Sequence, residues 1–573
     1  MNIMANEKSK AEQYRDERKA RIAKTAKKNA HNMEKRNTAK KVVGKVISIV
    51  LCAAIVLGIV AFSFNYYGVL QRVIKLGSVG TEQPVTIAEY EYYYMRAYNE
   101  IRYQAQYYQY YYQTSNGYDT SLAPDQQTQT TTDEDGNEIT WVEKLHDDTI
   151  SLIQIHKAYY NEAVKSGYEL SAADQAYIDK QIEDLREEAS NPSGSDSDES
   201  TVKYSLNAYL RKVYGGAVNE RFLRKQLKIQ VLAQKFVTER TAEIAKGYDQ
   251  KTIDEKYNKD TATYDFVTFR TYTFTAKELT ANDGESEEDF AARQSKADAE
   301  VKKNATDFFN AVTDEKSFAA KATELNKDTE DYNVDEETKF TMLQSSVKSS
   351  VSEDAATWLF DKSTKEGSKK LFTDEENGKY TIVLAVKAPH QEQTVTVRHI
   401  LLATQDTSSG EELSDEDKTE KKATADKVLK EFNASDKSED SFAALAYKYT
   451  EDTGSSSTGG LYENVYPGQM VTEFNDWIFD ANRKAGDVEM VQTSYGYHII
   501  YFVEDDGTNY YDSTIRSENA SEDFEAEAQE LIDGTTYHVF LGEKLTPYAE
   551  GKALDKINYL IELNNSSSSS STY

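Results

Sequence analysis

The chain has 573 residues, too many for one hydrophobic core, so several domains are expected. Its net charge of −31 is uneven, because residues 1–45 hold 14 Lys/Arg against 5 Asp/Glu and the remainder carries −40. So acidic a body excludes a nucleic-acid-binding protein, since phosphates require a basic face. Cys52 is the only cysteine, which excludes disulfides and cysteine-based zinc sites in the rest of the chain. We expect no metal and no cofactor.

The N-terminal region predicts a membrane anchor. Residues 46–64 form an uncharged stretch of 19 residues, long enough to cross a bilayer as a helix. The basic segment 1–45 precedes it, so the positive-inside rule places this tail in the cytoplasm and the bulk of the chain outside the cell membrane. A cleaved signal peptide is the competing interpretation, although no A-x-A site follows. A lipoprotein site at Cys52 is disfavoured because Leu51 precedes it.

The next region, 66–258, predicts a helical module. Its helices are expected at residues 87–112, 141–166, 171–189, 201–214 and 218–245, with a flexible acidic linker at 191–200. The first of these helices is unusually rich in tyrosine, which offers an apolar ring and a polar tip. Two interpretations stay open: the rings pack helices together, or they form an adaptable surface that binds chain segments. The region carries no catalytic constellation and suits a chaperone-like role.

An internal repeat follows. VTFRT at 267–271 resembles VTVRH at 395–399, and YTIV at 380–383 resembles YHII at 497–500. Between these pairs, SFAA recurs at 317–320 and 441–444, and WLFD at 358–361 corresponds to WIFD at 477–480. Residues 262–388 and 393–504 therefore read as two copies of one α+β unit. A segment with two expected helices (521–533 and about 545–560) and a Ser-rich end, 505–573, completes the chain.

Two strands of the second copy each carry a histidine, although the chain has only seven. His399 lies in the β-branched run 394–402 and His498 in the aromatic run 493–503. Side by side, these strands would bring the two imidazoles together. The alternative is that both histidines are hydrogen-bonded core residues with no catalytic role, and their spacing alone does not exclude this.

The second copy resembles the parvulin-type peptidyl-prolyl isomerases. The resemblance rests on five ordered blocks: VRHILL at 397–402, SFAALAYKYTED at 441–452, GGL at 459–461, PGQMVTEF at 467–474 and YGYHII at 495–500. It implies an antiparallel four-stranded sheet wrapped by helices. The wider layout of anchor, helical module and parvulin units resembles the extracytoplasmic foldases of the PrsA/SurA type.

By this resemblance, four residues form the catalytic network: His399, Asp452, Thr493 and His498. Met470 and Phe474 line the proline pocket, with Leu461 as a further wall. Two alternatives stay open. Met470 and Phe474 are four residues apart, a spacing typical of two core residues on one helix face. Asp452 lies in a loop where an aspartate often only stabilises a turn. In the first copy the framework survives but the functional positions differ, with Thr271 and Thr381 in place of the histidines. We therefore expect the first copy to fold as a degenerate unit that is not an isomerase.

The sequence thus predicts a membrane-anchored isomerase and chaperone for newly exported, unfolded chains. A holdase that uses both parvulin units as scaffolds is the non-enzymatic alternative. A surface-structural protein is a weaker one, suggested by the tyrosine and acidic content.

Overall fold

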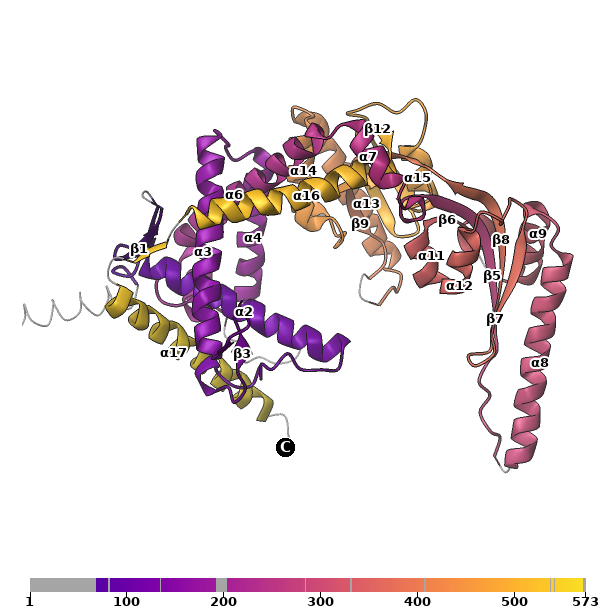
Figure 1. Cartoon of the computed structure of the whole chain (residues 1–573), viewed down its shortest axis with the longest axis horizontal. Coiled ribbons are helices and arrows are strands. Elements are labelled where there is room, and N and C mark those ends of the chain that lie inside the picture. Colours follow the sequence, from indigo (N-terminus) through magenta and orange to yellow (C-terminus); the bar gives the residue numbers. More distant parts are fainter. Residues whose placement is uncertain are drawn as a thin grey trace, which may run out of the picture.

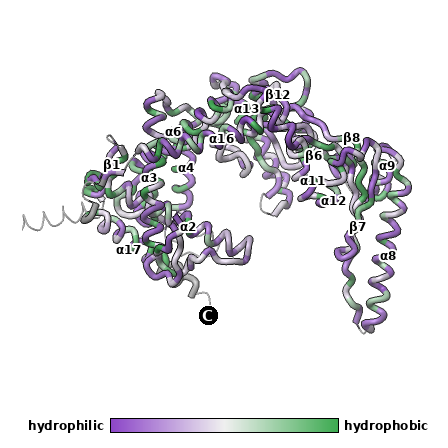
Figure 2. Tube along the Cα trace, in the orientation of Figure 1, coloured by the Kyte–Doolittle hydropathy of each residue, from purple (hydrophilic) through white to green (hydrophobic). Residues whose placement is uncertain are grey.

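The computed structural model describes residues 68–569, apart from 81–82, 134, 192–202, 284, 330–331, 407–408, 536 and 540–541. The basic tail and the expected membrane span at 46–64 lie outside this part. Among the helices that are described, none is both long and apolar enough to cross a membrane. In Figure 2, hydrophobic and hydrophilic residues accordingly alternate along the helices.

Three parts lie in a row (Figure 1). The helical module forms one end, the second repeat lies in the middle, and the first repeat forms the far end. The chain therefore runs out to the first repeat and turns back through the second.

The helical module is built from long helices with well-defined N-termini. Thr86, Thr140 and Ser171 each cap a helix through a reciprocal capping box, which satisfies backbone donors of the first turn. The helices are α2 (Ile87–Tyr111), α3 (Trp141–Lys165), α4 (Ala172–Ser190), α5 (Leu206–Tyr214) and α6 (Glu220–Gly247), followed by the short α7 (Gln250–Tyr257).

The tyrosines of α2 fall into two groups. Tyr90, Tyr93, Tyr94 and Tyr98 are at most 1% exposed and belong to the main core of the module. The six tyrosines toward the end of the helix are 39% to 78% exposed: Tyr103, Tyr107, Tyr108, Tyr110, Tyr111 and Tyr112, which we call the tyrosine face. The packing interpretation therefore holds for the first half of the helix only.

The C-terminal segment completes the helical module. Helix α16 (Tyr510–Asp533) packs on α6, where Phe524 contacts Phe236. Strand β13 (Tyr537–Val539) then joins a three-stranded sheet of order β13-β1-β2, with β1 (Lys75–Val79) and β2 (Gln83–Thr86). Helix α17 (Gly542–Ser569) places Ala549, Ala553 and Ile557 in the same core as α2. The sequence left the packing of this segment open, and in the structure both ends of the described chain build one module.

The two repeats have the same sheet topology. In the first, β5 (Phe266–Thr275), β6 (Lys339–Leu343), β7 (Lys369–Asp374) and β8 (Lys379–His390) form an antiparallel sheet of order β6-β5-β8-β7. In the second, β9 (Gln393–Ala403), β10 (Leu461–Val465), β11 (Val488–Thr493) and β12 (Gly496–Asn509) form one of order β10-β9-β12-β11. The prediction of antiparallel four-stranded sheets is thus confirmed.

Helices cover both sheets. The first repeat carries α8 (Glu287–Ala311), α9 (Glu315–Leu325), α10 (Val334–Thr338), α11 (Gln344–Ser350) and α12 (Glu353–Leu359). The second carries α13 (Asp415–Ala434), α14 (Glu439–Tyr449) and α15 (Thr472–Ile478). In the second repeat, one core lies between the sheet and the pair α13 and α14, and another lies between the sheet and α15. The histidine-bearing strands β9 and β12 are the central pair between these cores.

Candidate active site

The register of β9 and β12 brings the two histidines together. His399 lies opposite Ile500, and His498 lies opposite Leu401, so the histidines are diagonal neighbours on one face of the sheet. Their Nδ1 atoms are 3.1 Å apart, and their rings stack at an interplanar angle of 14°. Both residues are only 5% exposed.

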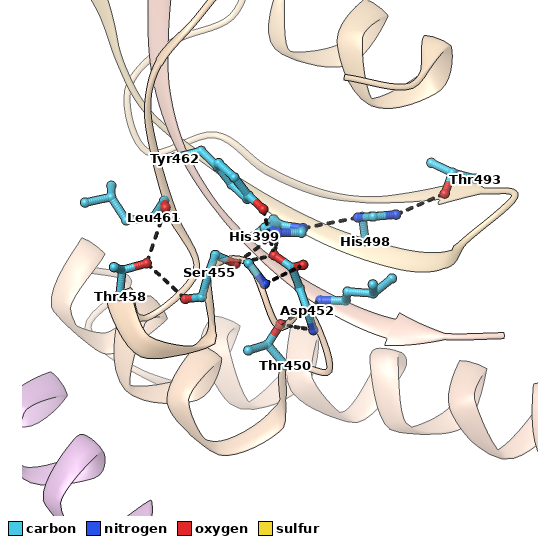
Figure 3. Close-up of polar contacts among 11 residues, drawn as sticks. His399, Thr450, Asp452, Ser455, Thr458, Leu461, Tyr462, Thr493 and His498 are labelled. Carbon is cyan, nitrogen blue, oxygen red and sulfur yellow. Dashed lines mark hydrogen bonds and ion pairs between the residues drawn. The ribbon is translucent and has the colours of Figure 1, made fainter. Parts of the chain in front are cut away.

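Asp452 joins this pair from the loop that follows α14. Its Oδ2 atom lies 2.8 Å from Nε2 of His399 and accepts hydrogen bonds from the hydroxyls of Ser455 (2.5 Å) and Tyr462 (3.0 Å). The backbone N–H of Gly454 donates to Oδ1 at 3.2 Å. Figure 3 shows these groups converging on one carboxylate, which is 19% exposed. The network therefore reaches solvent at Asp452.

Thr493 ends the network on the other side, with its Oγ1 atom 2.9 Å from Nε2 of His498. One set of tautomers satisfies every contact. The hydroxyl of Thr493 donates to Nε2 of His498, whose Nδ1–H donates to Nδ1 of His399. Nε2–H of His399 then donates to the carboxylate of Asp452. All four predicted catalytic residues thus form one directed chain of hydrogen bonds.

Burial and hydrogen bonds shift the pKa values of three residues in this network. Burial, together with the repulsion from His399, lowers the pKa of His498 to about 3, so this imidazole is neutral at physiological pH. Burial disfavours the carboxylate of Asp452, but hydrogen bonds from His399 and Ser455 outweigh it and hold the pKa well below its usual range. Burial and the charge of Asp452 raise the pKa of Tyr462 to about 12. At neutral pH the site therefore presents one carboxylate and two protonated hydroxyls.

The apolar residues expected around the proline take different places. Phe474 is 2% exposed and sets its ring nearly perpendicular to both imidazoles, at 5.5 Å from His399 and 5.4 Å from His498. Met470 is half-buried on the same apolar cluster. Leu461 begins β10 and points away from the histidines in Figure 3. Phe474 thus holds the imidazoles in place, while Met470 remains open to a ligand.

Two members of the network were missed from the sequence. Ser455 is fully buried and bonds to Asp452, and it lies in an ordinary-looking Ser/Gly loop. Tyr462 follows Leu461 in β10, and side chains alternate along a strand. Since Leu461 faces away, the alternation itself assigns Tyr462 to the histidine side.

A glycine sets the position of the loop beneath the site. Gly460 has a φ of +78°, and a Cβ atom there would lie 2.2 Å from the carbonyl oxygen of His399. Its own carbonyl accepts a hydrogen bond from the N–H of His399 at 2.8 Å. A side chain would therefore push the loop, with Ser455 and Asp452, away from the histidine strand.

Comparison with known proteins agrees with this geometry. The family model described as PPIC-type PPIASE domain matches residues 380–506, which include every residue of the network. This segment is a parvulin-type isomerase domain. The match begins in β8 and ends in β12, so the helical module and most of the first repeat lie outside it.

The chain is also similar to curated foldases over part of its length. Foldase protein PrsA 4 of Bacillus cereus is 30% identical over 193 residues, which are 34% of this chain and 59% of that protein. Foldase protein PrsA 3 of Bacillus anthracis is 45% identical over 76 residues, which are 13% of this chain and 26% of that protein. The chain thus spans less than two thirds of these relatives. The crystal structure of PrsA from Bacillus subtilis is 17% identical, covers 75% of this chain and 91% of its own, and has a TM-score of 0.18.

Proposed function

We propose that the protein is a foldase that isomerises X–Pro peptide bonds in unfolded, newly exported chains. The observation that carries the proposal is the closed network of His399, Asp452, Thr493 and His498 inside a parvulin-type domain. An X–Pro bond rotates over a barrier of about 18–20 kcal/mol, which takes tens to hundreds of seconds without help. An enzyme for this step breaks no covalent bond and needs only to favour the twisted amide.

The site is suited to this task in two ways. Amide resonance places negative charge on the carbonyl oxygen, and rotation removes it. The fixed carboxylate of Asp452 repels the negative charge on the oxygen of a bound planar amide. It therefore raises the free energy of the planar amide relative to the twisted one. Tyr462 and Ser455 hold this carboxylate in place, and the buried histidines keep it aligned from behind. Met470 offers a polarisable, adaptable contact for the proline ring.

The helical module would hold the client chain, with the tyrosine face as its contact surface. The end of α2, which carries this face, projects from the module (Figure 1), and residues 103–118 carry no charge. Its rings contact one another, for example Tyr107 and Tyr111 at 4.6 Å between centroids. Tyrosine supplies large contact area for varied chains at little entropic cost.

The site of action would be the outer side of the cell membrane, with a single-pass anchor at 46–64 and the N-terminus in the cytoplasm. The uncharged run and the basic tail before it support this placement. Partners would be unfolded exported polypeptides.

A protease-coupled or NMR assay of cis–trans exchange in a prolyl tetrapeptide tests the enzymatic claim on the full chain. We expect turnover that a triple variant, His399→Thr, Asp452→Ala and His498→Thr, abolishes. That result would also show that the first repeat contributes no activity. Turnover at the uncatalysed rate with the native chain would leave only a non-enzymatic holdase.

A further inference from the structure

The first repeat contains a cavity of about 470 Å³ that the isomerase reaction does not use. This volume lies within the range of about 300–1,000 Å³ that is usual for ligand pockets. Residues of β5, β6, α10, α11 and the loop after α9 line it: Thr271, Tyr272, Thr273, Asn326, Tyr332, Glu337, Phe340, Met342, Ser350 and Val351.

Strand register places this cavity where the isomerase site lies in the other repeat. Thr271 lies opposite Val383, as His399 lies opposite Ile500 in the equivalent strands. On the other side of the same strand, Phe340 pairs with Phe269 as Tyr462 pairs with Val397. Thr271 and Phe340 therefore stand in the places of His399 and Tyr462.

The residues that replaced the network leave one hydroxyl without a partner. Among the residues that the structure describes, the buried hydroxyl of Thr271 has no hydrogen-bond partner, and the nearby hydroxyl of Tyr332 has only the Asn326 amide beside it. A buried hydroxyl without a partner is unfavourable, because it has lost its hydrogen bonds to water. Both residues line the cavity, so an acceptor of a ligand there would supply the Thr271 hydroxyl with the partner that it lacks.

The other residues that line the cavity indicate which kind of ligand would carry such an acceptor. Phe340, Met342 and Val351 are half-buried and form an apolar wall, while Glu337 is exposed at the rim. An apolar residue would fill the wall, its flanking backbone carbonyls would accept from the hydroxyls, and a neighbouring basic side chain would meet Glu337. An extended polypeptide segment supplies all three.

The cavity lacks the groups that would rotate a peptide bond. Thr271 replaces a histidine, and Thr381 at the position of His498 bonds to Thr273 (2.9 Å) instead of to Thr271. Asp328, the sequence counterpart of Asp452, is exposed and does not line the cavity. Among the described residues that line the cavity, the one carboxylate is the exposed Glu337, so the first repeat can hold a segment without a buried carboxylate to act on it.

We propose that the first repeat is a peptide-binding site that holds an extended segment of an unfolded chain, centred on an apolar residue next to a basic one. This proposal rests on the proposed role in handling unfolded chains, but it requires no isomerase activity. The segment would be held at the far end of the molecule while the second repeat acts elsewhere on the same chain.

The test is fluorescence-anisotropy titration of the full chain with a fluorescein-labelled peptide, Gly-Ser-Lys-Leu-Ser-Gly-Ser. The probe contains no proline, so the isomerase site does not select it. We expect Val351→Trp, which fills the cavity, to raise the Kd at least about tenfold, in line with loss of an apolar contact. Thr271→Val should raise it about fivefold through one lost hydrogen bond. Replacing Leu with Ser in the probe should weaken binding as well.

Thr373→Val is the matched control, since Thr373 is an exposed threonine on the edge strand β7 outside the cavity. It should leave the Kd unchanged, and Val351→Trp should leave prolyl isomerisation unchanged. If Val351→Trp disturbs the fold, the Kd values of Thr271→Val and Glu337→Gln still test the proposal. A native Kd retained within twofold in Thr271→Val and Glu337→Gln would overturn the proposal. If the native chain showed no isomerisation, the proposed enzymatic function would be overturned, whereas the peptide-binding proposal would be unaffected.

Discussion

The Nδ1 atoms of His399 and His498 face each other at 3.1 Å, a contact that needs one shared proton. With Asp452 ionised, Nε2 of His399 carries a proton, so its Nδ1 is the acceptor when the ring is neutral. Nδ1 of His498 is then the donor, and its Nε2 accepts from Thr493. The neutral pair thus makes every contact with one directed set of protons. A doubly protonated His399 would reverse the direction, because its Nδ1–H would donate to His498 and Nε2–H of His498 would donate to Thr493.

The first prediction concerns acid stability. His498 has a folded pKa of about 3 against an ordinary 6.5, so between these values the unfolded chain binds more protons. Stability of the isomerase domain should therefore fall as pH drops below 6.5, by roughly 3 kcal/mol down to pH 4. His498→Thr should flatten this dependence, because the threonine does not titrate.

The measurement must be local, because burial also lowers the pKa of His156, in the helical module, to about 4. Hydrogen exchange of β12 amides in the full chain, followed from pH 7 to pH 4, reports the isomerase domain alone. Equal pH dependence of these amides in the native chain and in His498→Thr would contradict the assignment.

The second prediction separates the charge of Asp452 from its hydrogen bonds. Asp452→Asn keeps an oxygen that can accept from His399 but removes the negative charge. We expect kcat/KM for a prolyl tetrapeptide to fall about 10- to 100-fold, the scale of removing one preorganised electrostatic group. Asp328→Asn, at the exposed counterpart in the first repeat, is the control and should change nothing. Activity of Asp452→Asn within twofold of native would exclude a role for the charge.

Much of the fold follows from local patterns. Alternating β-branched residues in 394–402 and capping residues such as Thr140 mark elements directly, and repeated blocks such as SFAA reveal the duplicated unit. The return of the C-terminal segment could not be predicted in this way. Ile557 and Tyr90 share a core although they lie more than 400 positions apart, and helical periodicity does not name a partner.

The site shows the same limit at a smaller scale. His399 and His498 could be paired because strand register is regular. Ser455 could not, because its contact with Asp452 depends on a loop whose path is set by Gly460 against the backbone of His399. Such a close approach becomes visible only when both segments are placed in space.

The third prediction tests this loop. Gly460→Ala should destabilise the isomerase domain by about 2 kcal/mol or more and reduce isomerisation, because its Cβ atom would meet the carbonyl of His399. Gly486 offers a matched control: its φ is +89°, but a Cβ atom there meets nothing within 4 Å. Gly486→Ala should cost only about 1–2 kcal/mol of left-handed strain and spare activity. Urea unfolding of both variants, read at β9 amides, and the prolyl assay check this; equal loss of activity would refute it.

The fourth prediction concerns the tyrosine face. Replacing Tyr107, Tyr110 and Tyr111 with serine should weaken suppression of aggregation of an unfolded test protein, because the exposed rings supply its contact area. Stability of the module should stay within about 0.5 kcal/mol, as is usual for exposed positions. Light scattering during dilution from urea measures the effect. Prolyl tetrapeptide turnover serves as control and should not change, and undiminished suppression would assign client binding to another surface.

The last prediction tests whether the C-terminal helix is structural for the N-terminal module. Ile557 is fully buried against α2, whereas Tyr559, two residues further along α17, is 48% exposed. Ile557→Ala should therefore destabilise the module by about 2–5 kcal/mol through the cavity it leaves. Tyr559→Ala should stay within about 0.5 kcal/mol. Hydrogen exchange localises the effect: amides of α2 and β1 should exchange faster in Ile557→Ala only, because residues of both elements belong to the same core as Ile557. Faster exchange confined to α17 itself would show that the helix is an appendage and that the module is stable without it.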